Sequence, residues 1–368
     1  MTARNTDTPS AQRLPAELLY AEELAHLATH DKMPRPPGWN LSMPAIRDFI
    51  AGATVKGKTI RQKVVCASSL IERALVTLAS NRALLLVGEP GTAKSLLSEL
   101  LSAAVCGTST LTVQGSAATS EDQIKYGWNY ALLLNDGPTL RALVPSPLYR
   151  AMQEGRIARF EEITRCPPEV QDSLLSILSE RLLMVPELPE DGVIFARPGF
   201  NLIATANTRD RGVNEMSAAL KRRFAFETVF PIASYDNELA LVMSEVSRLL
   251  AQDRVPVQPN APLMEVLVTT FRDLRQGVDR EGGASDKLSS VLSTAEAVSV
   301  AHAVTLRGYY LRGDNGQAAD LVEALAGAAV KDNQDDLKKL RRYIEHRASK
   351  RKGEHWAAFH AARQALPQ

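Results

Sequence analysis

The chain has 368 residues, of which 45% are hydrophobic and 23% charged, so it is long enough and apolar enough to bury a large core. Its formal net charge is +1, from 43 basic and 42 acidic residues, which excludes a global attraction to nucleic acid or anionic lipid. The three cysteines are too few and too scattered for a disulfide framework or a metal cage.

The first 42 residues form an extension before the predicted domains. Residues 1–15 are polar and contain two prolines, so we expect them to be disordered, and they lack the apolar stretch of a signal peptide. Residues 16–27 can form a short helix, and the proline-rich segment 34–38 excludes helix. No apolar run reaches the roughly 20 residues that a membrane helix needs. We therefore expect a cytoplasmic protein without membrane insertion.

Residues 43–232 show the alternation of an α/β core. A helical pattern over 43–80 is followed by a buried strand at 83–87 and an amphipathic helix at 94–105. Further buried strands are predicted at 110–114, 157–160, 202–206 and 225–230. Since these runs lack polar alternation, they predict a five-stranded parallel sheet with helices on both faces.

The β pattern ends at Pro231, and helices are predicted after it, at 237–251, 264–275, 287–304 and 318–330. They indicate a helical lid domain over residues 233–332. Residues 333–368 form a basic helical tail with a break at Gly353 and eight Lys or Arg residues between 338 and 352. A solvated helical face explains that basic stretch better than contacts to nucleic-acid phosphates.

The sequence GEPGTAKS lies between the first strand and the amphipathic helix, which is the context of a phosphate-binding loop. Its glycines allow backbone N–H groups to surround phosphates, and the helix N-terminus favours anions. Lys94 is expected to bind the β- and γ-phosphates and Ser95 to hold Mg²⁺. Ala93 replaces a glycine, and we expect its methyl to be tolerated through a negative φ. The expected binding residues are Gly88, Glu89, Pro90, Gly91, Thr92, Ala93, Lys94 and Ser95.

Two adjacent acids, Glu161 and Glu162, end the strand at 157–160. Glu161 is expected to hold the Mg²⁺ shell through water, because its side chain is longer than the usual Asp, and Glu162 to polarise the attacking water. Asn207 ends the next buried strand and is expected to orient that water or contact the γ-phosphate. The alternatives are two solvated acids beginning a loop and an Asn that ends a strand at a turn.

Residues 215–226 are predicted to form a helix ending in Arg222 and Arg223, just before the last strand. An arginine at such an edge suits a finger that reaches the nucleotide of a neighbouring subunit. A surface basic pair is the alternative, and the sequence does not distinguish the two arginines.

In this order and spacing, the elements resemble the AAA+ ATPases, and specifically the MoxR family. GEPGTAKS is similar to the GxPGxAK loop of that family, ARFEEITRCPPEVQDSLLSILSE to its second motif, and FNLIATANT to its sensor-one strand. The resemblance implies that Asn207 is sensor one and Arg223 the finger. It also implies that Lys287, in the GGASDK turn, stands at sensor two, where a Lys lacks the bidentate fork of the usual Arg. Arg165 falls where the family places an interface Arg.

The resemblance implies ATP and Mg²⁺ as cofactors and a homo-oligomeric ring, expected to be a hexamer. Relatives act like chaperones on partners with a von Willebrand factor A domain, remodelling them or inserting a cofactor or metal. In the family, insertions at the positions of residues 127–143 and 187–198 contact the client; ordinary loops are the alternative.

Two other functions stay open. Residues 207–211 and LKRRFAF also resemble the GTP-using motor of methyl-directed restriction systems, although we do not expect nucleic acid as a partner. A nucleotide-binding scaffold without turnover is the third possibility, because Glu161 and Lys287 depart from the family pattern.

Overall fold

The computed structural model describes residues 12–188, 192–207, 213–278, 283, 285–289, 292–329, 331 and 333–367. The chain forms two compact units. One comprises Met1–Gly88 and Ala93–Val229, and the other comprises Glu89–Thr92 and Phe230–Gln368. In the described part of the chain, no helix combines the length and the apolar character that crossing a membrane requires.

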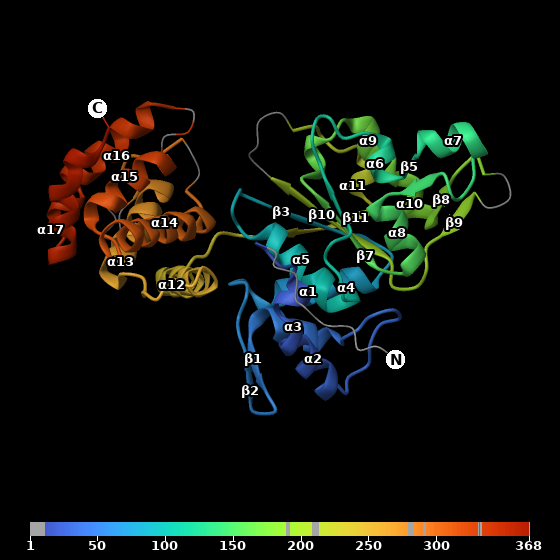
Figure 1. Ribbon diagram of the computed structural model, residues 1–368, viewed down its shortest axis with the longest axis horizontal. Helices are drawn as coiled ribbons and strands as arrows, with labels where there is room; N and C mark the ends of the chain where they lie inside the picture. The colour runs from blue at the N-terminus through green and yellow to red at the C-terminus, as the bar shows by residue number, and fades with distance from the viewer. Residues whose placement is uncertain are drawn as a thin grey trace. The chain divides into compact units, whose positions relative to one another are not determined.

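The first unit is built on a five-stranded parallel sheet, as predicted (Figure 1). The strand order is β11-β3-β10-β7-β4, so β3 and β10 are neighbours near the middle of the sheet. Because the strands are parallel, their carboxyl ends meet at one edge. The strands are β3 (Ala83–Gly88), β4 (Thr112–Gln114), β7 (Ile157–Glu161), β10 (Asn201–Asn207) and β11 (Phe224–Thr228).

Helices cover both faces of this sheet because successive side chains of its buried strands point to opposite sides. Leu84 and Leu86 of β3 belong to one hydrophobic cluster, and Ala83 and Leu85 to the other. The first cluster includes α1 (Ala16–Leu19), α2 (Ala21–His30), α3 (Met43–Ala51), α4 (Ser68–Ala79) and α5 (Lys94–Cys106). The second includes α6 (Glu121–Ile124), α8 (Pro147–Glu154), α9 (Pro168–Asp172), α10 (Leu174–Glu180) and α11 (Ala218–Lys221).

The helical pattern predicted over 43–80 is interrupted by a β-hairpin, so a continuous helix there was wrong. Strands β1 (Ala53–Val55) and β2 (Lys58–Ile60) pair antiparallel. The two residues between them, Lys56 and Gly57, have φ angles of 47° and 82°. Two successive positive φ angles define the turn that suits a tight hairpin, and the Gly supplies one of them at little cost.

The predicted helix at 215–226 is also shorter than expected. Its helical part, α11, has four residues, and Ser217 caps it by accepting a hydrogen bond from the Leu220 N–H. Arg222 and Arg223 follow that helix directly, and β11 begins at Phe224.

Two insertions project from the first unit with exposed apolar side chains. Strands β5 (Tyr126–Trp128) and β6 (Leu143–Pro145) pair antiparallel and enclose helix α7 (Tyr130–Asp136), none of whose residues is buried. Strands β8 (Leu182–Met184) and β9 (Val193–Phe195) form a hairpin, between which residues 189–191 lie outside the described part of the chain. The insertions expose Tyr130, Leu134, Leu140, Val144, Met184, Val193 and Phe195.

The second unit is helical, as predicted for the lid. Its elements are α12 (Tyr235–Gln252), α13 (Ala261–Gln276), α14 (Thr294–Arg312), α15 (Ala318–Ala329), α16 (Asp335–His346) and α17 (Glu354–Ala361), with 3-10 turns at Ala348–Lys350 and Ala362–Ala365. Helix α14 begins seven residues later than the predicted 287, because Ser293 and Glu296 form a capping box there.

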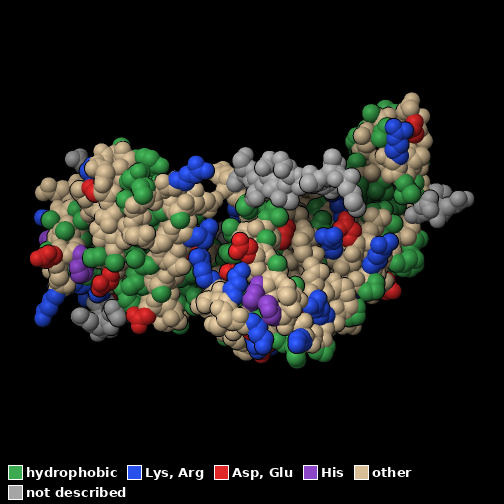
Figure 2. Space-filling view, turned by 60° about the horizontal axis from the view of Figure 1, so that its bottom comes forward, with side chains coloured by type: hydrophobic (Ala, Val, Ile, Leu, Met, Phe, Trp, Pro, Cys, Tyr) green, Lys and Arg blue, Asp and Glu red, His purple; other side chains and the backbone are tan. Residues whose placement is uncertain are grey.

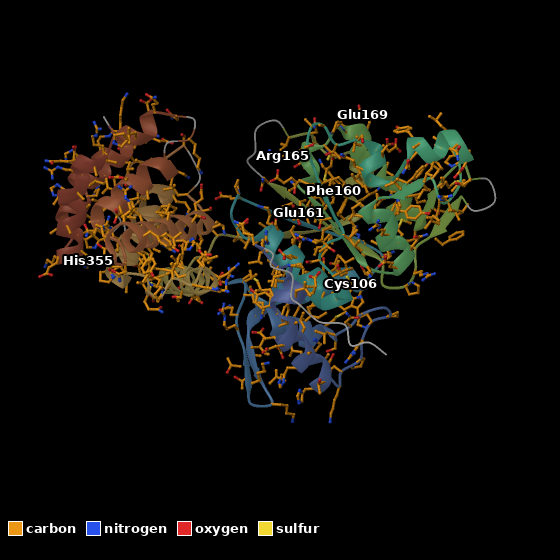
Figure 3. The ribbon with its side chains drawn as sticks, in the orientation of Figure 1. Cys106, Phe160, Glu161, Arg165, Glu169 and His355 are labelled. Carbon is orange, nitrogen blue, oxygen red and sulfur yellow. The ribbon has the colours of Figure 1, made fainter. Side chains whose placement is uncertain are left out.

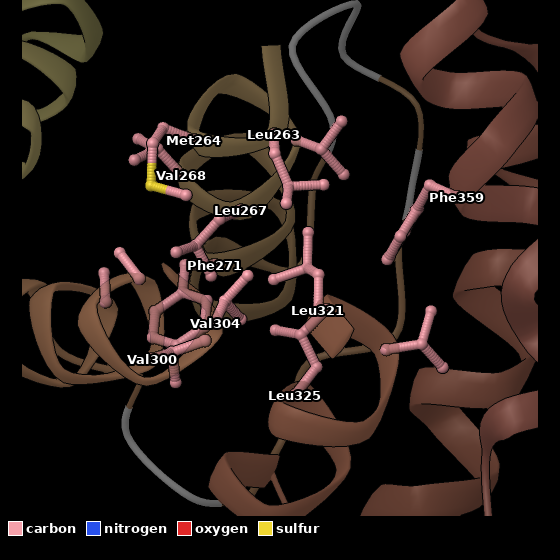
Figure 4. Packing of buried hydrophobic residues seen from close by; sticks show 14 of the residues in the cluster. Leu263, Met264, Leu267, Val268, Phe271, Val300, Val304, Leu321, Leu325 and Phe359 are labelled. Atoms are coloured by element: carbon pink, nitrogen blue, oxygen red, sulfur yellow. The ribbon is translucent and has the colours of Figure 1, made fainter. Parts of the chain in front are cut away.

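Residues 333–368 share one hydrophobic core with residues 233–332. Phe359 of α17 belongs to the same cluster as Leu267 and Phe271 of α13 and Leu321 of α15 (Figure 4). The last two helices are therefore part of the helical unit by packing, although the segment 338–352 is rich in Lys and Arg.

Candidate functional site

The predicted phosphate loop connects the end of β3 at Gly88 to the start of α5 at Lys94. Within it, Thr92 Oγ1 donates a hydrogen bond to the Glu89 carbonyl at 2.9 Å, and Pro90 stands before Gly91, whose φ is 74°. Ala93 has φ 66° and ψ 24°, so the negative φ that we expected is wrong. The left-handed conformation is the one that the usual Gly adopts freely, and for Ala it costs about 1–2 kcal/mol.

Lys94 and Ser95 open the 13-residue helix α5 at the carboxyl edge of the sheet. The Lys94 side chain is buried, and its Nζ donates a hydrogen bond to the Gly88 carbonyl at 3.1 Å. The Ser95 hydroxyl donates to Glu161 Oε2 at 2.7 Å. The phosphate loop and the first acid are thus joined, as the sequence predicted, at a helix N-terminus that favours anions.

Glu161 is buried at the end of β7, on the face covered by α5. Its Oε2 accepts hydrogen bonds from Ser95 and from Thr205 Oγ1, the latter at 2.8 Å, and its Oε1 accepts from Ser98 Oγ at 2.6 Å. Arg159 NH2 lies 2.8 Å from the same Oε1. Burial raises the pKa of Glu161, but the Arg159 charge and the three hydroxyl groups lower it by more, so its pKa lies below the ordinary value.

Oxygen ligands suited to Mg²⁺ are present at this point. Since the Ser95 hydroxyl donates its proton to Glu161, its lone pairs remain available for a cation. The Glu161 oxygens already accept from four side chains, which fits a water-bridged contact better than a direct one. The residues therefore fit Mg²⁺ with Ser95 as a direct ligand and Glu161 in the outer shell.

Glu162 adopts a left-handed backbone, with φ 55° and ψ 46°, at the point where β7 ends. Its N–H donates to Thr205 Oγ1 at 3.0 Å, which fixes it beside β10. The partly exposed carboxylate forms an ion pair with Arg165, at the end of the 3-10 turn Ile163–Arg165. Figure 3 labels Arg165 and the neighbouring Glu161. A non-glycine residue in this conformation is strained, and such strain is concentrated at functional sites.

Asn207 ends β10 and lies opposite Gly88 in the strand register. In a strand, every second side chain shares a face, so Asn207 and Thr205 lie on the same side of the sheet. The structure thus brings Lys94, Ser95, Glu161, Glu162 and Asn207 to one edge of the sheet. Residues 208–211, which carry the resemblance to a restriction motor, lie outside the described residues.

The predicted arginine fingers do not join this cluster. Arg223 lies at the other end of the sheet: its carbonyl accepts the N–H of Ala83, the first residue of β3, at 3.0 Å. Its guanidinium contacts the Ser179 hydroxyl and, at 2.5 Å, the Ala219 carbonyl, whereas Arg222 is exposed. Lys287, the expected sensor two, belongs to the helical unit and is exposed. Gly282 and Ala284 of its turn lie outside the described residues.

The sequence did not identify three polar residues of this site. Arg159, Thr205 and Ser98 each contact Glu161 and lie on three different elements, β7, β10 and α5. Arg159 could have been predicted from the sequence. It stands in the middle of a buried strand, two residues before Glu161, so the two side chains must lie on the same face.

Comparison with known proteins agrees with this fold. Residues 83–224 match the AAA domain of the dynein-related subfamily, and residues 236–366 match the C-terminal domain of YehL-like AAA+ ATPases. The crystal structure of NtrX from Brucella abortus in complex with ADP has the same fold, with a TM-score of 0.50 at 14% identity. That match covers 78% of this chain and 62%, less than two thirds, of the NtrX chain.

These findings define an AAA+ ATPase, an enzyme that hydrolyses ATP. Protein YehL of Escherichia coli (strain K12) is 57% identical over 357 residues, which covers 97% of this chain and 98% of that protein. The chain belongs to the YehL-like AAA+ ATPase family. Protein SH1500 of Staphylococcus haemolyticus (strain JCSC1435) is more distant, at 29% identity over 57% of this chain and 74% of its own length.

Proposed function

We propose that this ATPase is a MoxR-type motor, which assembles into a ring and uses ATP hydrolysis to remodel a partner protein or to insert a cofactor or metal into it. The observation that supports it is the chain of contacts from Ser95 through Glu161 and Thr205 to Glu162. These contacts join the phosphate loop to both acids across neighbouring strands, which is the arrangement that phosphoryl transfer to water needs.

In this proposal the residues divide the chemistry among them. Lys94 and the loop N–H groups bind the β- and γ-phosphates of ATP, and Ser95 with Glu161 would hold Mg²⁺, which neutralises developing charge. Glu162 accepts a proton from the attacking water, and Asn207 orients that water or the γ-phosphate. The Glu162 carboxylate pairs with Arg165, whereas that of Glu161 pairs with Arg159, so the two neighbouring carboxylates have different surroundings and can serve different roles.

The position of Arg223 supports a ring. Strand β3 has six residues, so Arg223 and the phosphate loop, at its opposite ends, are separated by roughly 16 Å at about 3.3 Å per residue. An arginine that far from its own nucleotide is placed to act on that of a neighbouring subunit. Mixing Arg223→Ala and Lys94→Ala subunits tests this, because each variant alone should be inactive and recovered turnover in the mixture requires a finger supplied in trans. A mixture that stays inactive contradicts the proposal.

The two insertions are the proposed client-contacting surface. Leu134 is 89% exposed and Phe195 69% exposed, so both can contact a partner without unfolding. We propose a separate chain with a von Willebrand factor A domain as that partner. Figure 2 shows basic and acidic side chains scattered among other residues on one face. With a formal net charge of only +1, this favours a protein client over a nucleic acid.

The decisive experiment is Glu162→Gln. We expect this variant to bind ATP with wild-type affinity and to hydrolyse it 10²–10⁴-fold more slowly, roughly the contribution of general base catalysis. Undiminished turnover contradicts the base role, and the scaffold alternative predicts no turnover in the wild type either. The ATP-bound variant should retain its partner in a pull-down; GTP preference with salt-dependent DNA binding would instead support the restriction-type motor.

A further inference from the structure

Arg159 is an unexpected charge in the core of the nucleotide-binding unit. It is the middle residue of β7, only 9% exposed, on a strand whose five residues are all buried. Burial of an isolated guanidinium is costly, so a charge in this place requires a partner and a full set of acceptors.

The acceptors of Arg159 come from three elements. Its Nε donates to Ser98 Oγ at 3.0 Å and its NH2 to the Ser95 carbonyl at 3.0 Å, both on α5. Its NH1 donates to the Ser109 carbonyl, just before β4, at 2.9 Å, and to Thr112 Oγ1, in β4, at 3.4 Å. The ion pair with Glu161, at 2.8 Å, completes the set. The guanidinium thus links the first turns of the phosphate-loop helix to the strand that ends in Glu161.

The arrangement divides the two oxygens of Glu161. Oε1 faces Arg159 and Ser98, whereas Oε2 accepts from Ser95 and Thr205. Oε2, which accepts from the expected Mg²⁺ ligand Ser95, is therefore the oxygen that does not pair with Arg159.

We propose that Arg159 is the resident counter-ion of the metal acid: it keeps Glu161 compensated and oriented without a divalent cation, and it lessens the contribution of Mg²⁺ to nucleotide binding. This inference rests on the proposed role of Glu161. A guanidinium paired with the carboxylate reduces the negative charge that Mg²⁺ encounters and repels the cation itself. Three hydroxyl groups, from Ser95, Ser98 and Thr205, keep the carboxylate oriented when Arg159 is replaced.

The test measures the dissociation constant of ADP by titration calorimetry, once with EDTA and once with excess Mg²⁺. The ratio is the constant in EDTA divided by the constant in Mg²⁺, so a larger ratio means a larger contribution of Mg²⁺ to binding. In Arg159→Met we expect this ratio to rise by roughly tenfold, because Mg²⁺ then provides the missing positive charge. Arg159→Lys keeps a charge and should leave the ratio within about twofold of the wild type. An unchanged or lower ratio in Arg159→Met overturns the proposal.

Arg156→Met is the matched control, because Arg156 pairs at 2.8 Å with Glu154 on the surface, one residue before β7. It should change neither the ratio nor the melting temperature. Arg159→Met should melt at a lower temperature without metal, and Arg159→Met/Glu161→Gln should recover most of that loss, since it removes both buried charges. If Arg159→Met does not fold, the double variant decides, and its failure to fold as well overturns the counter-ion role.

Glu161→Gln separates this inference from the function on which it rests. Loss of the Mg²⁺ dependence in Glu161→Gln, combined with an unchanged ratio in Arg159→Met, refutes only the counter-ion role. A Glu161→Gln variant with the wild-type ratio refutes the metal acid itself.

Discussion

At the scale of single residues, the phosphate loop contains a conformation that its sequence disfavours. Ala93 has a positive φ of 66°. Ala93→Gly should therefore leave the free energy of unfolding unchanged or raise it by up to about 1.6 kcal/mol, because relief of a steric cost of about 1–2 kcal/mol equals or exceeds the loss of about 0.4–1 kcal/mol in chain entropy. Chemical denaturation measures the change.

The control for this prediction is Ala103→Gly, in the buried, regular part of α5. Gly there should destabilise by about 1 kcal/mol from helix propensity alone, with no strain to relieve. Equal losses in the two variants would show that Ala93 is not strained.

The ion pair between Arg165 and Glu162 suggests a restraint on the proposed base. Arg165→Met should raise basal ATP turnover two- to fivefold, since a partly exposed pair contributes up to about 1 kcal/mol and its loss frees the carboxylate for water. Steady-state hydrolysis measures this. Lys125→Met, which breaks the surface pair of Lys125 with Glu121, is the control. A fall in turnover would instead assign Arg165 a role in catalysis or assembly.

Sequence predicted those site residues that belong to local motifs. Lys94 and Ser95 follow a glycine-rich loop, and Glu161 and Glu162 end a strand, so each is recognisable within a few residues. Thr205 and Arg159 contact Glu161 through strand pairing and helix packing, which depend on a register that one sequence does not give.

At the scale of elements, the tip of β4 approaches the tip of β7 closely. A Cβ on Gly115 would lie 2.4 Å from the Glu162 carbonyl oxygen, and the Gly115 N–H donates to the Glu161 carbonyl at 2.7 Å. Gly115→Ala should displace Glu162 and lower the turnover of ATP by roughly 10–100-fold, because catalysis depends on sub-ångström placement of the base. Its affinity for ATP should stay within about threefold of the wild type.

Gly127→Ala is the control for this prediction, because a Cβ on Gly127, in β5, meets no atom within 4 Å. It should keep wild-type turnover. If Gly115→Ala also keeps it, the close approach of the two strand tips does not position the base.

Long, uniformly buried elements were predictable, and short ones with turn chemistry were not. The strands β3 and β10 are continuous, mostly apolar runs, a pattern typical of a strand buried on both faces. The hairpin at 53–60 is set by Gly52 and by the Lys56–Gly57 turn, whose positive φ angles interrupt a segment with helical spacing on both sides. Helix α11 shortens because tertiary packing, not propensity, decides a four-residue segment.

At the scale of the whole molecule, the sequence predicted an α/β core and a helical lid, and residues 333–368 were predicted as a separate basic tail. The charge pattern predicted a solvated helical face within 333–368, and the opposite face of these helices buries Leu340, Tyr343, Ile344 and Phe359 in the core of the helical unit. In an amphipathic helix with many Lys and Arg residues, the few apolar residues of the buried face are inconspicuous in the sequence. The structure shows which elements cover that face.

A buried polar link reinforces this association. Tyr343 Oη and Arg351 NH2 each donate to Asp273 Oδ2 at 2.7 Å, and Asp273 is 2% exposed on α13. Burial raises the pKa of Tyr343, which keeps its hydroxyl protonated as a donor. Removal of the tail would take both of these donors from a buried carboxylate, a loss that costs about 3–5 kcal/mol in comparable pairs.

The helical unit should therefore fold alone, but only with its last two helices. All buried residues of its core lie between Val242 and Leu366, so we expect a fragment of residues 230–368 to be helical by circular dichroism and to melt cooperatively. A fragment of residues 230–332 should melt without cooperativity, because it exposes the apolar faces of α13 and α15 and takes the Tyr343 and Arg351 donors from Asp273. A cooperative transition in the shorter fragment would show that the tail is an appendage after all, and a non-cooperative one in both would mean that the helical unit depends on the nucleotide-binding unit.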